Sequence, residues 1–253
     1  MAAPRVDVLG CEVDRLDMGE TLRLCEETIE TGGFAQHVCI NAAKLVSLRD
    51  DRRLREIVER CEVVSADGQS IVWASRLLGE PLPERVNGTE LMFRLLDLAE
   101  RKGYGVYVLG ARRQILERAV ARLREDYPAL RIVGHHDGYF HDEDGAAVAD
   151  AIRAAAPQIL FVAISSPRKE YWLAEHGRAL GVPLVMGVGG SIDIVAGVTR
   201  RAPRWMQRAG LEWLFRLLQE PRRMWRRYLT TNARFLNLLG RELVRRRLAA
   251  RRA

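Results

Sequence analysis

Two polar residues of the sequence follow short apolar runs and could act on a bound ligand. Asp67 comes shortly after the run Glu62–Ser65, and Asn41 comes directly after the run His37–Ile40. A carboxylate in this position can remove the proton of an attacking hydroxyl, and an amide can hold a ligand hydroxyl. Asp and Asn are also common caps at the start of a helix, and capping is the more frequent role of either residue considered alone.

Two glycine turns also follow apolar runs and could approach a phosphate. Gly110 ends the run Val106–Leu109, and a second turn contains Gly187 and Gly189. The first turn leads into a helix whose first N–H groups can bind phosphate, although many such turns serve packing alone. The second turn lacks the Lys of a P-loop, and Ile192 stands where a dinucleotide fingerprint has its third Gly. These patterns argue against an ordinary P-loop NTPase or dehydrogenase.

The sharpest charge feature is an arginine cluster near the C-terminus. Arg216, Arg223 and Arg226 are separated by seven and three residues, so they share one helical face if the helix continues through Pro221. Guanidinium groups bind phosphate in a bidentate manner and can stabilise a departing diphosphate in place of a metal ion. The alternative for part of the cluster is a solvated or lipid-facing basic surface.

Two further patterns have the form of metal sites. Asp142 and Asp144 form a D-x-D pattern, and His135, His136 and His141 lie close to it. Acidic residues are also typical of a helix start, and the histidines have no Cys or carboxylate at convincing ligand spacing. The four cysteines form no zinc pattern. We therefore predict no metal site, and we expect reduced thiols.

Charge is distributed unevenly along the 253 residues. Residues 200–253 contain 16 Arg, no Lys and three Glu, a formal charge of +13, so the rest carries −6 within the net +7. Such a basic segment attracts the phosphates of lipids, nucleic acid or a ligand. We find no apolar run of about 18 residues and no secretory signal pattern, so we expect a cytoplasmic protein without a transmembrane helix.

These residues need a scaffold, which the alternation of apolar runs and helical patterns predicts. The pattern indicates an α/β fold with a mostly parallel sheet flanked by helices, and ligands of such sheets bind beyond the carboxyl ends of the strands. The expected strands are Val6–Leu9, His37–Ile40, Glu62–Ser65, Val106–Leu109, Arg131–Gly134, Ile159–Ile164 and Leu184–Gly187. The expected helices are Met18–Thr31, Ala42–Arg60, Gln69–Leu78, Thr89–Arg101, Arg112–Asp126, Gly145–Ala155 and Arg168–Leu180.

The pattern changes near residue 200. Beyond it the periodicity is helical only, with arginines between Trp, Leu and Phe, and Pro221 suits the first turn of a long last helix. We therefore divide the chain into a catalytic α/β domain, 1–199, and a basic amphipathic helical appendage, 200–253.

Several longer stretches, together running from about Asn41 to Phe235, carry a family resemblance. They are NAAKLV, VSADGQSIVWASRLLG, LPERVNGTEL, VYVLGA, DGYF, VAISSPRKEYW, GVGGSIDIVAG and RAPRWMQRAGLEWLFRLLQEPRRMWRRY. With them the chain resembles the WecG/TagA/CpsF glycosyltransferases, glycosyltransferase family 26. The resemblance implies a Rossmann-like core and an appendage that completes the active site and docks on the inner face of the cell membrane. It also implies an inverting, metal-independent transfer from a UDP-sugar to a polyprenyl-diphosphate-linked sugar, without a cofactor, in cell-surface polysaccharide or teichoic-acid-type biosynthesis.

The resemblance also assigns roles to individual residues. Asp67 is similar to the catalytic base of the family. The implied substrate-binding residues are Cys39, Asn41, Arg85, Asn87, Gly110, Lys169, Gly187, Gly189, Arg216, Arg223 and Arg226. The glycines among them are expected to approach the nucleotide, and the last three arginines the diphosphate.

One stretch departs from the family pattern. Lys169 and Ser165 stand where many relatives have Gln and Gly. An ammonium group in place of an amide changes both the charge and the hydrogen bonding of the pocket. The donor sugar therefore stays open between an N-acetylhexosamine, a hexose and a uronic acid.

The basic appendage leaves a second function open, that of an Arg-rich module that binds nucleic acid or anionic lipid without catalysis. Its alternation of Arg with apolar residues at helical spacing favours a membrane surface over nucleic acid. A nucleotide-sugar isomerase would need a nicotinamide, for which no adequate fingerprint is present. We therefore predict a peripheral membrane glycosyltransferase whose partners are a UDP-sugar, a polyprenyl-diphosphate-linked acceptor and an anionic membrane surface, and not nucleic acid. The sequence leaves a homo-oligomer open.

Overall fold

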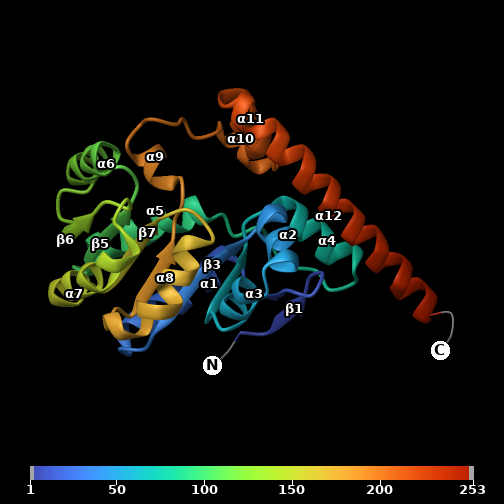
Figure 1. The fold of residues 1–253 in the computed structure, drawn as a ribbon, viewed down its shortest axis with the longest axis horizontal. Coiled ribbons are helices and arrows are strands. Elements are labelled where there is room, and N and C mark those ends of the chain that lie inside the picture. Colours follow the sequence, from blue (N-terminus) through green and yellow to red (C-terminus); the bar gives the residue numbers. More distant parts are fainter. Residues whose placement is uncertain (1–2, 251–253) are drawn as a thin grey trace.

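A six-stranded sheet forms the centre of the protein (Figure 1). The computed structural model describes residues 3–250, apart from the side chains of Arg208, Arg223, Met224, Arg227 and Ala250. The strands are β3 (Ala35–Ile40), β4 (Val63–Ala66), β5 (Gly105–Gly110), β6 (Arg131–His136), β7 (Ile159–Ala163) and β8 (Leu184–Gly187). Their order is β4-β3-β8-β7-β5-β6 and all neighbours are parallel, which confirms the predicted α/β fold.

The register of the sheet brings the polar strand ends together. In the β3–β4 pair, Ile40 lies opposite Ala66. The next residues, Asn41 and Asp67, therefore leave the sheet at the same edge, where the carboxyl ends of parallel strands meet.

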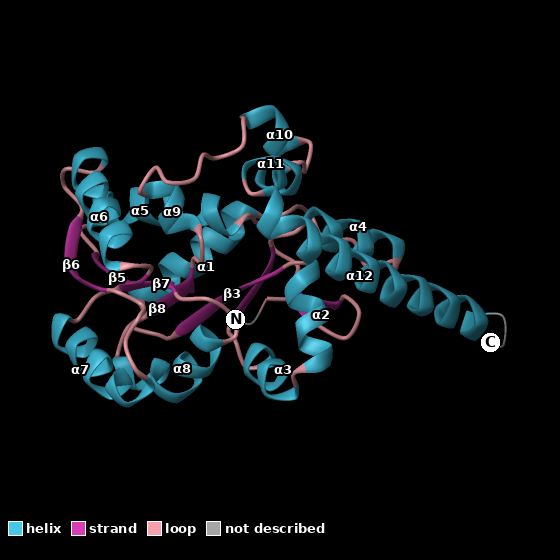
Figure 2. Ribbon diagram, turned by 45° about the horizontal axis from the view of Figure 1, so that its top comes forward, coloured by secondary structure: helices cyan, strands magenta, loops and turns pink. Residues whose placement is uncertain are grey.

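Helices cover both faces of this sheet (Figure 2). They are α1 (Met18–Glu30), α2 (Ala42–Asp50), α3 (Arg52–Glu59), α4 (Gln69–Leu77), α5 (Gly88–Lys102), α6 (Arg113–Asp126), α7 (Gly145–Ala155), α8 (Arg168–His176), α9 (Ser191–Val195), α10 (Arg204–Arg208), α11 (Glu212–Gln219) and α12 (Pro221–Ala250), with two 3-10 turns, η1 (Asp142–Asp144) and η2 (Gly177–Leu180). α1, α5, α6 and α9 contact one another on one face, whereas α3, α7 and α8 lie on the other. Because both faces are covered, strands such as β7 are continuous apolar runs.

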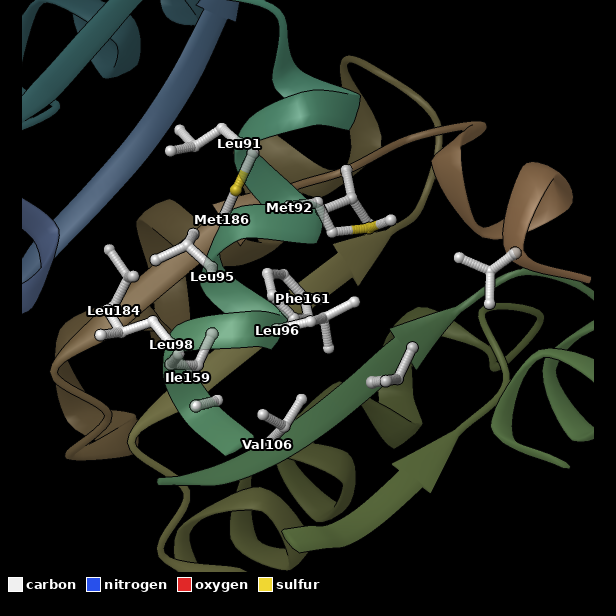
Figure 3. Close-up of a cluster of buried hydrophobic side chains, with 14 of the residues drawn as sticks. Leu91, Met92, Leu95, Leu96, Leu98, Val106, Ile159, Phe161, Leu184 and Met186 are labelled. Carbon is white, nitrogen blue, oxygen red and sulfur yellow. The ribbon is translucent and has the colours of Figure 1, made fainter. Parts of the chain in front are cut away.

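The largest apolar cluster lies between α5 and the strands β5, β7 and β8 (Figure 3). Leu91, Leu95 and Leu98 recur every three or four residues, so they share the face of α5 that meets the sheet. Phe161 of β7 is 1% exposed beneath them. This packing fixes α5 against the sheet, and with it the residues just before α5 that enter the site.

Several local features differ from the sequence-based expectation. The strand expected at Val6–Leu9 is Arg5–Asp7, and the helix expected at Arg168–Leu180 ends at His176. The helix expected at Ala42–Arg60 is two helices, because Asp51 breaks it and caps α3 by accepting the amide hydrogen of Leu54 at 2.9 Å. The sequence pattern also misses strand β2 (Glu12–Asp14), which pairs antiparallel with β1 (Arg5–Asp7). It misses the five-residue helix α9 as well, since so short a helix leaves little periodicity to detect.

After α9, the regular elements of the described residues are the helices α10, α11 and α12. Helix α12 begins at Pro221, as predicted, and lies along α2. Phe235 and Leu239 are buried in the apolar cluster that includes α2, and Arg234 donates to both carboxylate oxygens of Asp50 at 2.8 and 2.7 Å. Within residues 3–250, the structure has no helix with the length and apolarity that a bilayer crossing requires.

Candidate active site

Asp67 follows β4 at the carboxyl-end edge of the sheet, and its carboxylate is held from another part of the chain. Its Oδ1 accepts hydrogen bonds from the side-chain amide of Asn87 and the backbone amide of Gly88, both at 3.1 Å. The capping interpretation is wrong for Asp67: α4 has Gly68 at its N-cap, with no side-chain cap bond. The Asp67 carboxylate is therefore available for a role other than starting the helix that follows it.

The surroundings of Asp67 raise the pKa of its carboxyl group. Burial is the largest cause, and the negative charge of Glu212 acts in the same direction. The Gly88 amide and the guanidinium groups of Arg85 and Arg216 oppose this rise without cancelling it. A carboxylate with a raised pKa is a stronger base, which suits proton abstraction from a hydroxyl.

The two predicted asparagines both cap helices, and one of them does more. Asn41 Oδ1 accepts the amide hydrogen of Lys44 at 3.0 Å at the start of α2. Asn87 Oδ1 caps α5 in the same way, accepting from Glu90 at 3.0 Å. Asn87 then uses its Nδ2 to donate to both Asp67 and Glu212, each at 3.1 Å. Its side chain thus joins a helix start to the candidate base.

Helix α11 reaches the site through Glu212. The Glu212 carboxylate lies 2.5 Å from the Arg85 guanidinium, which also donates to the backbone carbonyl of Gln207 at 3.2 Å. Gly210 lies in the turn between α10 and α11. A Cβ added to it would lie 2.8 Å from Cγ of Gln69, the first residue of α4. Only a glycine lets the turn between α10 and α11 lie this close to the chain that follows Asp67.

A buried charged cluster lies at the neighbouring strand ends. Lys44 Nζ donates to Ser166 Oγ at 2.8 Å and to Glu170 Oε1 at 2.5 Å, and Lys169 Nζ lies 3.0 Å from the same carboxylate oxygen. The charges of Asp67, Lys169 and Lys44 also affect the pKa of the Cys39 thiol. Burial raises the pKa of that thiol, so Cys39 is a neutral, partly buried wall of the site.

Two of the predicted glycines allow a close approach, and the third has a backbone conformation that favours glycine. A Cβ on Gly187 would lie 2.5 Å from Cε of Lys169, and one on Gly110 would lie 2.4 Å from the carbonyl carbon of Ala163. Gly189 has a φ of +50°, a left-handed conformation that favours glycine. The Gly110 contact serves the packing of β5 against β7, whereas Gly187 makes room for a charged side chain above its strand end.

The three predicted arginines do not share one helix. Helix α11 ends before Glu220 and α12 begins after it, so Arg216 lies on one helix and Arg223 and Arg226 lie on the next. Arg216 reaches the second glycine turn, because a Cβ on Gly190 would lie 3.1 Å from its Nη2. Arg226 is exposed and its guanidinium lies 5.3 Å from the Trp225 ring centroid, while the side chain of Arg223 lies outside the described structure.

The acidic and histidine patterns make contacts other than those around Asp67 and Glu170. Asp142 is in the exposed turn η1 before α7 and pairs with Arg168 at 3.3 Å, which fits the helix-start interpretation. His136 lines a cavity of about 400 Å³ with Tyr139 and Asp144. Over the described residues, no group of three or more His, Cys, Asp or Glu side chains is placed to hold a metal ion.

The sequence analysis missed three charged residues of the site, which are Lys44, Glu170 and Glu212. The first two stand inside conspicuous stretches, three residues after Asn41 and one residue after Lys169. Glu212 is one of only three acidic residues in the strongly basic segment after residue 200. An acid in so basic a segment was the available signal, and its partner Arg85 could not be identified from spacing.

Comparison with known proteins identifies the family of the chain. A family model described as "Glycosyl transferase WecG/TagA/CpsF family" matches residues 6–249. The chain is also similar to an N-acetylglucosaminyldiphosphoundecaprenol N-acetyl-beta-D-mannosaminyltransferase of Bacillus spizizenii. The two proteins are 35% identical over 178 residues, which make up 70% of this chain and 68% of the relative.

Proposed function

The chain belongs to the WecG/TagA/CpsF family of glycosyltransferases, and we propose that it transfers a sugar from a UDP-sugar to a polyprenyl-diphosphate-linked sugar, with inversion and without a metal ion. The name of the Bacillus spizizenii relative supports the acceptor class, since it refers to a lipid-linked diphosphate sugar. The UDP donor and the metal-free chemistry are parts of the proposal that the site must support.

The placement of the Asp67 carboxylate is the observation that carries this proposal. Among the described residues, Asn87 and Gly88 donate hydrogen bonds to this group, and both bonds go to Oδ1. Held in this way, the carboxylate has a defined orientation and its Oδ2 is left for a substrate hydroxyl. Proton transfer to a positioned base of raised pKa contributes about 10²–10⁴-fold to such a reaction.

The proposed reaction is a single displacement. Asp67 takes the proton of the acceptor hydroxyl while the hydroxyl oxygen bonds to the anomeric carbon of the donor. The bond from that carbon to the diphosphate breaks, and UDP leaves with the electron pair. Attack from the side opposite the leaving group inverts the anomeric centre.

Arg216 is the described residue best placed to hold the departing UDP. Its guanidinium lies against Gly190 at the end of the turn that follows β8. It can therefore meet a diphosphate that approaches the glycine backbone, and a guanidinium provides two parallel donors to phosphate oxygens. Arg223 and Arg226 stay predictions for this role.

We further propose that residues 200–253 dock on an anionic membrane surface. Trp225, Leu229 and Leu236 are separated by four and seven residues, share one face of α12 and are all exposed. The buried Phe235 and Leu239 lie on the face that packs on α2. An exposed apolar face with arginines beside it suits the interface of an anionic bilayer, where the lipid-linked acceptor would be found.

A donor panel tests the proposal directly. The purified protein is incubated with UDP-sugars, a short-chain polyprenyl-diphosphate-sugar and EDTA, and UDP release is measured. We expect release that depends on the acceptor and persists in EDTA, with a product of inverted anomeric configuration by NMR. Release that needs an added divalent ion, or that proceeds equally without the acceptor, would contradict the proposed mechanism.

A further inference from the structure

Helix α11 carries Glu212 and Arg216 on one face, because the two residues are four positions apart. Glu212 accepts from Arg85 at 2.5 Å and from Asn87 at 3.1 Å, beside the candidate base. The Nη2 atom of Arg216 lies 3.1 Å from where a Cβ on Gly190 would be, at the second glycine turn. One turn of α11 therefore joins the surroundings of the base to the proposed place of the diphosphate.

Fully buried side chains do not fix α11 to the catalytic domain. None of its eight residues, Glu212–Gln219, is buried. Its main packing neighbours are α10 and α12, which belong to the same appendage. The chain that joins α9 to α10 has neither helix nor strand over residues 196–203 (Figure 1). The place of α11 over the strand ends therefore depends on its polar contacts with the catalytic domain.

Glu212 makes such contacts, and its two partners are themselves held in place. Asn87 caps α5 by accepting the amide hydrogen of Glu90 at 3.0 Å. Arg85 also donates to the backbone carbonyl of Gln207 in α10 at 3.2 Å. The side chains of the Arg85–Glu212 pair are 15% and 21% exposed, so water screens the pair only in part. Hydrogen bonds between charged groups are stronger than neutral ones, so this contact is suited to hold a helix in place.

We propose that Glu212 is a positioning residue, whose contacts with Arg85 and Asn87 set the place of α11 and so bring Arg216 to the diphosphate of UDP. This inference rests on the proposed function, in which Arg216 holds the departing UDP. It predicts an effect opposite in sign to that of charge alone. Removing a negative charge near the site would by itself strengthen the binding of an anionic nucleotide, whereas loss of positioning weakens it.

A double-mutant cycle on UDP affinity, measured by calorimetry, tests the inference. Glu212→Ala should weaken UDP binding by roughly tenfold, about as much as Arg216→Ala. The double variant should bind UDP no more weakly than Arg216→Ala alone, because a displaced Arg216 has nothing left to lose. Glu212→Gln should keep most of the wild-type affinity, since its amide oxygen can still accept from both partners. Glu242→Ala is the matched control, because the 17% exposed Glu242 pairs with arginines of its own helix, and it should leave the affinity unchanged.

Amide hydrogen exchange distinguishes a displaced helix from a misfolded protein. In Glu212→Ala the amides of α11 should exchange faster, because so short a helix is marginal without its contacts. The amides of β3 and β7 should stay as protected as in the wild-type protein. Arg216→Ala should leave the protection of α11 unchanged, since in this proposal Arg216 is placed by the helix and does not hold it.

The outcomes separate this inference from the proposed function. Tighter or unchanged UDP binding in Glu212→Ala would overturn the role of Glu212, and so would an Arg216→Ala variant with wild-type affinity. Losses that multiply to roughly a hundredfold in the double variant would also overturn it, because they would show that the two residues act independently. Absence of acceptor-dependent UDP release from every donor would contradict the proposed function, and the UDP titrations would still decide whether Glu212 positions Arg216.

Discussion

The carboxylate of Glu212 lies 2.5 Å from the guanidinium of Arg85, although 127 positions separate the two residues in the chain. The side chains are only 21% and 15% exposed, so this ion pair is partly shielded from water. The same Glu212 oxygen accepts a hydrogen bond from Asn87, which also donates to Asp67. Helix α11 is thereby connected to the candidate base through one intervening side chain.

Glu212→Gln should move the acid limb of the pH–activity profile to lower pH. The pKa of Asp67 is raised by burial and, further, by the negative charge of Glu212. The amide keeps an oxygen that can accept from Asn87 but removes the charge, so the pKa of Asp67 should fall and the base should stay ionised in more acidic solution. The measurement is kcat/KM for UDP release against pH.

Glu56→Gln is the control for this experiment, because Glu56 forms an exposed i,i+4 pair with Arg52. It should leave the profile where it is. An acid limb that is unmoved or higher in Glu212→Gln would show that Asp67 is not the group that titrates in the profile.

Asp67→Asn should lower turnover by about 10²–10⁴-fold. The amide oxygen can still accept from Asn87 and Gly88, so the local structure and the affinity for UDP should persist. Turnover is measured as acceptor-dependent UDP release, and UDP affinity by calorimetry. Asp150→Asn, in an exposed pair with Arg153, is the matched control. Near wild-type turnover in Asp67→Asn would remove Asp67 from the role of base.

Arg216→Ala should weaken UDP binding by roughly tenfold or more, since it removes charge-assisted hydrogen bonds to the diphosphate. Arg226→Ala is the informative comparison, because Arg226 is exposed beside Trp225 on the next helix. Calorimetry with UDP measures both variants. A larger effect of Arg226→Ala would mean that α12 moves toward the nucleotide when it binds.

Two adjacent residues of α12 separate its packing from its membrane contact. Phe235 is 4% exposed, so Phe235→Ala should lower the free energy of unfolding by about 3–5 kcal/mol. Leu236 is 64% exposed, so Leu236→Ala should change stability by less than about 0.5 kcal/mol and weaken binding to anionic liposomes. Denaturant unfolding and liposome flotation measure the two effects. Unchanged flotation of Leu236→Ala would argue against docking through this face.

Gly88 and Gly240 form a matched pair of helical glycines. A Cβ on Gly88 would lie 2.7 Å from Sγ of Cys39, whereas one on Gly240 would meet no atom within 4 Å. Gly88→Ala should therefore destabilise the protein by about 1–3 kcal/mol. Gly240→Ala should stabilise it by roughly 0.5–1 kcal/mol, because alanine loses less conformational freedom in a helix.

Cys39→Ala should relieve much of the Gly88→Ala penalty, because it removes the sulfur atom that the new Cβ would meet. The free energies of unfolding of both single variants and the double variant form a complete cycle. Strictly additive effects would contradict a direct contact between the two side chains.

Local features of the sequence predicted most of the elements. The bounds expected for β8 and α7 are those observed, because each is a clear apolar or periodic segment between turn residues. The role of Asp67 was harder to predict. Asp67 and Gly68 can each precede a helix, and the choice between them depends on Gly88, 21 residues further along the chain, to whose amide Asp67 is bound.

By itself the sequence determined the α/β pattern, the concentration of arginine after residue 200 and the resemblance to a glycosyltransferase family. All three depend on residue types and on spacings of a few positions. Only the tertiary structure decided that Glu212 meets Arg85, that Arg216 reaches Gly190 and that Lys169 lies over Gly187. These contacts follow from the strand order and from the packing of α11 and α8 over the strand ends, and no local spacing encodes them.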